Sequence, residues 1–303
     1  MIPDLIKNPD SKLYVYCTLV SVVAVVAASV IGLVYIAIAT PSEAYILTSK
    51  GDESLGIGIP VLCIAVFILC LALVIKDLID RLRDCPPEDR DRRFMTAPLS
   101  KAGILMAITA FTSIAVVLFS DLINESITND FIDEMTDYEL IVSMACAGPQ
   151  EEFLCRILMI GLPVFIISAI KGYGNSSKYL FGGFGMSKVA LVFLIISSVV
   201  FGLIHLDGWS IMKFPDTFIS GMLFGYVYIE YGAHTSIVMH SAFDILASFD
   251  VFFDGAGTVP LIALAIIGVI LTIRSLCKIR DYFPEKNLHD PFEGTVLQMW
   301  GRD

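Results

Sequence analysis

Long apolar runs dominate the sequence, and they restrict the folds available to this chain more than any other feature. The first run extends from Leu13 to Thr40. A helix of about 20 apolar residues is enough to cross the hydrocarbon core of a bilayer. Hydrophobic residues make up 56% of the 303 residues and charged residues only 17%, which excludes an ordinary soluble domain. We therefore expect an all-α, polytopic transmembrane helix bundle, embedded in membrane lipid.

The positions of the runs predict about eight spans in a single integral-membrane domain, residues 1–303. The spans lie at roughly 13–40, 56–76, 102–122, 140–170, 189–206, 216–232, 234–250 and 258–276. The fourth is too long for one straight crossing, and proline suits the first turn of a helix. We therefore expect Gly148-Pro149 to interrupt it. Glu151 and Glu152 would then lie in the first turn of a new helix, where the macrodipole favours carboxylates.

The distribution of Lys and Arg predicts the orientation of the bundle. The segment between spans two and three is basic, with Lys76, Arg81, Arg83, Arg90, Arg92, Arg93 and Lys101. The next connector is acidic and contains no Lys or Arg. The positive-inside rule places the basic segment in the cytoplasm, and alternation over eight spans then puts both termini on the same side. The net charge of −11 argues against a nucleic-acid partner, because nucleic-acid binding needs a basic face.

Two adjacent carboxylates, Glu151 and Glu152, lie inside an apolar run. A charged side chain in a membrane span costs roughly 2.5–3.5 kcal/mol on insertion scales, so such residues are often functional. Glu152 and Arg156 are four residues apart, share a helix face and can pair. Glu151 points about 100° away from Glu152 and cannot easily reach the same Arg. Glu151 is therefore the better candidate for a reactive general base, whereas a Glu152–Arg156 pair is often only structural.

Two histidines lie in or at the end of apolar runs. His205 ends the fifth span, and Phe201, four residues earlier, should pack beside its ring. His240 lies within the seventh span, with Asp244 on the same helix face. Each element has a simpler explanation, because a lone His can merely hydrogen-bond a neighbouring helix. The three patterns together are much less easily explained as incidental.

These patterns resemble the CAAX-protease and bacteriocin-processing (CPBP, or ABI) family of intramembrane endopeptidases, which includes the type II CAAX prenyl proteases. That family has Glu-Glu-x-x-x-Arg, Phe-x-x-x-His and His-x-x-x-Asn on successive core helices. Here Glu151 to Arg156, Phe201 to His205 and His240 to Asp244 correspond to these motifs. The resemblance covers roughly residues 138–250, which we treat as the catalytic core, and leaves the first three spans unassigned.

The resemblance implies an intramembrane endopeptidase that hydrolyses prenylated (CAAX-type) or other membrane-associated peptides. Glu151 would activate a water molecule with the help of His205. His240 and the residue at position 244 would stabilise the oxyanion, and Glu152 with Arg156 would support the site. Peptide hydrolysis needs such an activated water and donors aimed at the developing negative charge.

Asp244 departs from the family pattern, because an ionised Asp cannot donate a hydrogen bond to an oxyanion as an Asn can. Three outcomes are open. Asp244 is kept protonated, or it orients His240 as an imidazolium donor, or the oxyanion role is impaired. We favour the second, because the spacing of four residues suits a His240–Asp244 contact.

Metal use is a second open question. Glu151, His205 and His240 could form a zinc site with two histidines and one carboxylate. The sequence lacks the His-Glu-x-x-His helix of common zinc proteases, and we favour the metal-free interpretation.

Depth raises a conflict with the resemblance. The type II prenyl proteases act on cytosolic tails, which implies a cavity open to the cytoplasm. The predicted orientation instead puts His205 near the outer end of its span, with Glu151 about 16 Å deep in a straight span four at 1.5 Å per residue. The two could meet if the start of span four is tilted or re-entrant.

Two alternatives to a protease fit the same polar residues. The first is a proton-coupled transporter in which Glu151, His205 and His240 form a relay. The second is a catalytically inactive membrane scaffold of the same fold. Cleavage of a peptide that depends on Glu151 and His205 would separate the protease from both.

Overall fold

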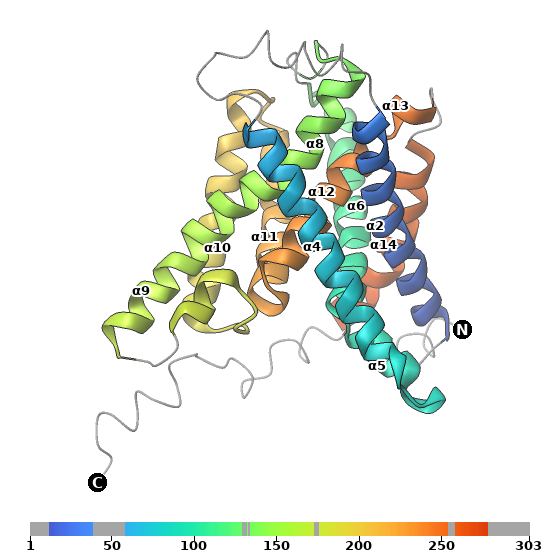
Figure 1. Ribbon diagram of the computed structural model, residues 1–303. Coiled ribbons are helices and arrows are strands. Elements are labelled where there is room, and N and C mark those ends of the chain that lie inside the picture. Colours follow the sequence, from blue (N-terminus) through green and yellow to red (C-terminus); the bar gives the residue numbers. More distant parts are fainter. Residues whose placement is uncertain are drawn as a thin grey trace.

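The computed structural model describes residues 12–38, 58–128, 132, 134–172, 176–253 and 258–277, and all regular elements in these ranges are helices (Figure 1). The elements are α2 (Lys12–Ile38), α4 (Gly58–Arg83), η1 (Pro87–Asp89), α5 (Arg90–Thr96), α6 (Pro98–Leu122), α8 (Asp137–Glu152), η2 (Phe153–Gly161), α9 (Leu162–Ile170), η3 (Ser176–Phe181), α10 (Lys188–Ile204), η4 (His205–Asp207), α11 (Lys213–Tyr231), α12 (Ala233–Ala247), α13 (Asp250–Phe253) and α14 (Thr258–Cys277).

The protein is an integral, multi-pass membrane protein. Six helical segments in the described ranges are long and apolar enough to cross a bilayer, namely α2, α4, α6, the continuous α8–η2–α9 segment, α10–η4 and α14. Large apolar side chains on their outer faces are exposed, as a lipid-facing surface requires. Examples are Val23, Leu62, Leu69, Leu118, Ile195 and Ile266.

The two remaining predicted spans coincide with α11 and α12, which are 19 and 15 residues long. They are not among the six membrane-crossing segments, so the number of eight spans stays a prediction. The cytoplasmic location of both termini concerns residues outside the described ranges. It also stays a prediction.

The predicted break at Gly148-Pro149 is wrong. Helix α8 runs through Pro149 and continues without interruption into the π-helix η2 and then α9. Glu151 and Glu152 therefore lie at the end of α8 rather than in the first turn of a new helix. Because the bilayer core offers no water to backbone groups, a continuous helix satisfies them better than a break does. A π-helical stretch is also a common feature of functional sites.

The length of the fourth span is accommodated by tilt, without a re-entrant segment. In Figure 1, α8 and α9 cross the bundle obliquely from its upper to its lower end. The start of α8 is fixed by a capping box in which Thr136 and Glu139 each bind the other's backbone N–H. The tilt brings Glu151 beside the end of α10.

Helix α12 is the centre of the bundle. It packs against α2, α4, α6, α8 and α11, and most of its side chains are buried. Val238, Met239 and Ala242 of α12 belong to the main apolar core together with Phe67 of α4 and Met106 of α6. This packing fixes the position of His240, the one histidine in the middle of α12.

Helices α8 and α12 approach each other closely at Gly148. A Cβ atom built there would lie 2.9 Å from the carbonyl oxygen of Ile237 and 2.9 Å from the backbone nitrogen of Ser241. Backbone atoms of a packed helix cannot move aside as a flexible side chain can. Glycine at this position therefore allows α8 to carry its two glutamates against α12.

We predict that Gly148→Ala lowers the apparent melting temperature of the purified protein, because the added methyl group forces α8 away from α12. Overpacking of this kind costs about 1–3 kcal/mol. Gly58→Ala is the matched control, since nothing lies within 4 Å of a Cβ built at Gly58. Equal melting temperatures for the two variants in a fluorescence thermal-shift assay would contradict the close approach.

Candidate active site

Glu152 lies at the end of α8 and is fully buried, with polar contacts to three side chains. Its Oε2 is 3.4 Å from Nε of Arg156 and accepts a hydrogen bond from the hydroxyl of Ser236. Its Oε1 is 2.9 Å from Nδ1 of His240. Since a carboxylate only accepts, Nδ1 of His240 carries the proton in this contact. Glu152 thus joins α8 to α12 through charge-assisted hydrogen bonds.

Arg156 is fully buried one turn after Glu152, in η2. Besides the carboxylate of Glu152, it donates from Nη1 to the hydroxyl of Ser197 at 2.9 Å. Its guanidinium lies 4.9 Å from the centroid of the Phe201 ring, within the range of a cation–π contact. The predicted pairing of Glu152 with Arg156 is therefore present, and it links α8 and η2 to α10.

His240 presents its second nitrogen, Nε2, to two more carboxylates. Nε2 lies 3.6 Å from Oε2 of Glu151 and 3.4 Å from Oδ2 of Asp244. The imidazole stacks on Phe224 of α11, with ring centroids 4.3 Å apart and planes 16° apart. Three carboxylates and one aromatic face therefore fix the orientation of this buried ring.

His205 is the first residue after α10. Its Nδ1 is 2.7 Å from the carbonyl oxygen of Phe201, and since a carbonyl only accepts, Nδ1 is the protonated nitrogen. The ring of Phe201 lies 4.6 Å from the ring of His205, as the spacing of four residues predicted. The other nitrogen, Nε2, faces Glu151 at 3.9 Å from Oε2.

Glu151 lies between the two histidines. Its Oε2 has no direct hydrogen bond to any residue in the described ranges. The separations of 3.9 Å and 3.6 Å from Nε2 of His205 and His240 are longer than a direct hydrogen bond. Oε2 itself is buried, whereas the side chain of Glu151 as a whole is partly exposed at the cavity.

These side chains line one cavity of about 900 Å³, within the size range of small-molecule and cofactor sites. Glu151, His205, His240 and Asp244 all lie on its wall, although they come from three separate segments of the chain. Apolar side chains such as Met144 and Phe243 form much of the remainder. The structure thus brings together the residues that the sequence placed on separate spans.

Three further wall residues were not predicted. Lys213 at the start of α11 lies 2.8 Å from Asp216 and 4.6 Å from the ring centroid of Trp209. Asp216 also accepts a hydrogen bond from Ser113 of α6 at 2.5 Å. These contacts hold the wall of the cavity at the α10–α11 connection. The sequence offered only the spacing of Lys213 and Asp216 as a signal, and this spacing also occurs on ordinary solvated helix faces.

The contact between Glu152 and His240 was also not predicted. A signal existed, because Ser236 and His240 are four residues apart and share the helix face that meets Glu152. Spacing along one helix, however, does not reveal which neighbouring helix that face contacts. Glu152 therefore contacts the cavity residue His240 in addition to Arg156.

The sequence left open a zinc site formed by Glu151, His205 and His240. Within the described ranges, no group of three or more His, Cys, Asp or Glu side chains is arranged to hold a metal ion. Oε2 of Glu151 lies 3.9 Å from Nε2 of His205 and 3.6 Å from Nε2 of His240, and the metal-free interpretation stays a prediction.

Comparison with known families assigns the part of the chain that contains this cavity. Residues 136–246 match the model of the family described as type II CAAX prenyl endopeptidase Rce1-like. This segment is thus similar to the Rce1-like family. The Rce1-like segment includes all four cavity residues predicted from the sequence, and the family supports a protease role in general. Helices α2, α4, α6 and α14 lie outside the match. Searches of curated proteins and of solved structures gave no match.

We predict that the two neighbouring glutamates differ in their effect on stability. Glu152→Ala leaves Arg156 buried without its carboxylate, which costs about 3–5 kcal/mol, so the apparent melting temperature should fall strongly. Glu151→Ala, the matched control, removes a side chain that is 33% exposed to the cavity and should change it much less. Thermal unfolding of both purified variants measures this. A larger loss for Glu151→Ala would contradict the assigned contacts.

Proposed function

We propose that this protein is an intramembrane endopeptidase that hydrolyses peptide bonds of prenylated (CAAX-type) or other membrane-associated peptides. The main support for this proposal is the position of the Glu151 carboxylate. Oε2 of Glu151 faces the Nε2 atoms of both His205 and His240 on the wall of a single cavity. A carboxylate beside two imidazoles provides a proton acceptor and hydrogen-bond partners for an attacking water.

In this proposal Glu151 is the general base, and His205 helps to position the water. His205 is suited to that task because Nδ1 is committed to the carbonyl of Phe201. Its Nε2 is therefore the atom directed at the cavity and at Glu151. A fixed tautomer and a packed ring reduce the reorganisation needed when the water reacts.

Hydrolysis then proceeds through a tetrahedral intermediate, with Glu151 accepting and returning one proton. The water oxygen adds to the scissile carbonyl carbon while its proton passes to Glu151. The C–N bond of the tetrahedral intermediate then breaks, and Glu151 returns the proton to the leaving amine. The products are a new carboxylic acid and a new amine, the acid then passes its proton to the amine, and no step passes through a metal ion.

The oxyanion of the intermediate is assigned to His240. Nδ1 of this ring is held by Glu152, so Nε2 is the nitrogen free to donate toward the cavity when the ring is an imidazolium. Asp244, on the same helix and 3.4 Å from Nε2, pairs with that cation. This is the second of the three roles considered for Asp244, and Asp244 acts through His240 as a positioning residue.

We predict that Glu151→Gln and His205→Ala each abolish cleavage of a membrane-associated peptide. Loss of general base catalysis lowers rates by about 10²–10⁴. Glu88→Gln, the same substitution at an exposed residue of η1, is the matched control. The measurement is cleavage of a farnesylated reporter and of a non-prenylated transmembrane reporter by the purified protein. Full activity in Glu151→Gln would contradict the proposal.

We expect Asp244→Asn to lower the turnover number about tenfold or more, although it introduces the amide found in the family pattern. An amide cannot compensate the charge on the imidazolium of His240 as a carboxylate does. The pH profile of turnover should also change, because the charge next to His240 is removed. Unchanged or improved cleavage in Asp244→Asn would show that an amide at position 244 is sufficient for activity and that the charged carboxylate is not needed.

A further inference from the structure

The cavity opens at one identifiable end of the bundle. Its wall includes Ile132 before α8, Gly208 and Trp209 between α10 and α11, and Asp250 and Val251 of α13. From there the wall extends along α8 and into η2 as far as Cys155 and along α11 as far as Phe224, while its residues on α12 lie in the second half of that helix. In Figure 1 the start of α8 and α13 lie at the upper end, whereas α5 lies at the lower end. The cavity is therefore reached from the end opposite α5.

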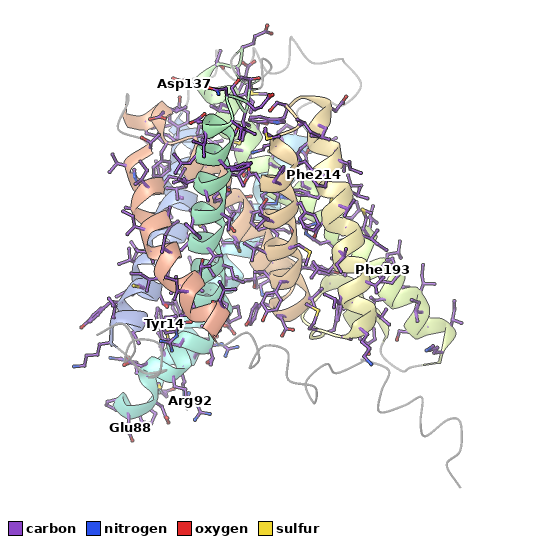
Figure 2. The ribbon with its side chains drawn as sticks, turned by 180° about the vertical axis from the view of Figure 1, so that it is seen from behind. Tyr14, Glu88, Arg92, Asp137, Phe193 and Phe214 are labelled. Atoms are coloured by element: carbon purple, nitrogen blue, oxygen red, sulfur yellow. The ribbon has the colours of Figure 1, made fainter. Side chains whose placement is uncertain are left out.

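The end that contains α5 is basic. Figure 2 places Arg92 and Glu88 at this end and Asp137 at the other. Basic side chains gather where α4 ends, along α5, and where α6 and α10 begin. They are Arg81, Arg83, Arg90, Arg92, Arg93, Lys101 and Lys188. Such residues in short connectors mark the cytoplasmic face of a membrane protein.

The end with the cavity mouth has the opposite composition. The described residues between the cores of α6 and α8 include Asp121, Glu125, Glu134 and Asp137 but no Lys or Arg, and 248–253 likewise contains Asp250 and no Lys or Arg. Asp207 and Asp250 are exposed at the cavity wall. Lys213 is the one Lys or Arg among the wall residues, and it pairs with Asp216 at 2.8 Å.

From these two distributions we infer that the cavity opens on the extracytoplasmic face of the membrane. Of the two substrate classes in the proposed function, this selects the second, a non-prenylated peptide segment of a membrane-anchored polypeptide that is exposed on that face close to its membrane anchor. The identification of a substrate rests on the proposed function. The membrane face on which the cavity opens does not depend on catalysis. The charge distribution and the family resemblance point to opposite faces for the cavity. The inference follows the charge distribution rather than the cytosolic access that the family resemblance implies.

Cysteine accessibility tests the sidedness directly. The described free cysteines are buried except for Cys85, which is half-buried. In a Cys85→Ser, Cys277→Ser background, two exposed acidic residues form a matched pair, Asp250→Cys at the mouth and Glu88→Cys in η1. A membrane-impermeant maleimide is added to sealed bacterial spheroplasts that express the full chain. We expect Asp250→Cys to be labelled at least tenfold more than Glu88→Cys, which should react only after the membrane is permeabilised.

Labelling of Glu88→Cys in sealed spheroplasts would overturn the inference, whether or not Asp250→Cys also reacts. Protection of Asp250→Cys until permeabilisation would overturn it as well. Both readings need only folded, inserted protein, so an inactive protein with the expected labelling would count against the proposed function and leave the sidedness in place.

A paired reporter then tests the substrate class. One single-span reporter carries the same cleavable segment on the extracytoplasmic side of its anchor, and its partner carries it on the cytoplasmic side. We expect Glu151-dependent cleavage of the first reporter alone. Cleavage of the cytoplasmic reporter alone would contradict the assigned face, and no cleavage of either, with the expected labelling, would contradict the protease function instead.

Discussion

The buried carboxylate of Glu152 is the interaction on which the rest of the site depends. It binds Arg156 and, across the helix interface, Ser236 and His240. A buried charge is costly unless its partners satisfy it, and removal of one partner is correspondingly destabilising. The same carboxylate that pairs with Arg156 therefore also fixes Nδ1 of His240. As a result, the other nitrogen of that ring faces Glu151.

Several close approaches allow this arrangement. Gly148 lets α8 reach the backbone of α12, and the oblique path of α8–η2–α9 brings Glu151 to the end of α10. Phe201 then contacts three site residues, since its ring packs on His205 and under Arg156 and its ring edge meets His240. Glu151 lies on the cavity wall, and its Oε2 has no direct hydrogen bond to any residue in the described ranges. Of the two adjacent glutamates, Glu152 thus contributes to stability, whereas Glu151 is the proposed reactive group.

Much of the fold could be predicted from the sequence, because apolar runs of sufficient length have few alternatives to membrane helices. Contacts within one helix were also predictable, as for Glu152 with Arg156 and His240 with Asp244, because they follow from a spacing of four residues. The break at Gly148-Pro149 was wrong, since a proline in a membrane helix can be accommodated by a following π-helix. Contacts between helices, such as Glu152 with His240, depend on tilt and packing, which one sequence does not specify.

The central claim is that Glu151 and His205 act as one catalytic unit on a single water. A double-mutant cycle in turnover number tests it most directly, with Glu151→Gln, His205→Ala and the double variant compared on the same membrane-associated peptide. Residues that act as a unit have strongly non-additive effects. The account predicts that the double variant is no slower than the slower single variant. Multiplication of the two single effects would contradict it.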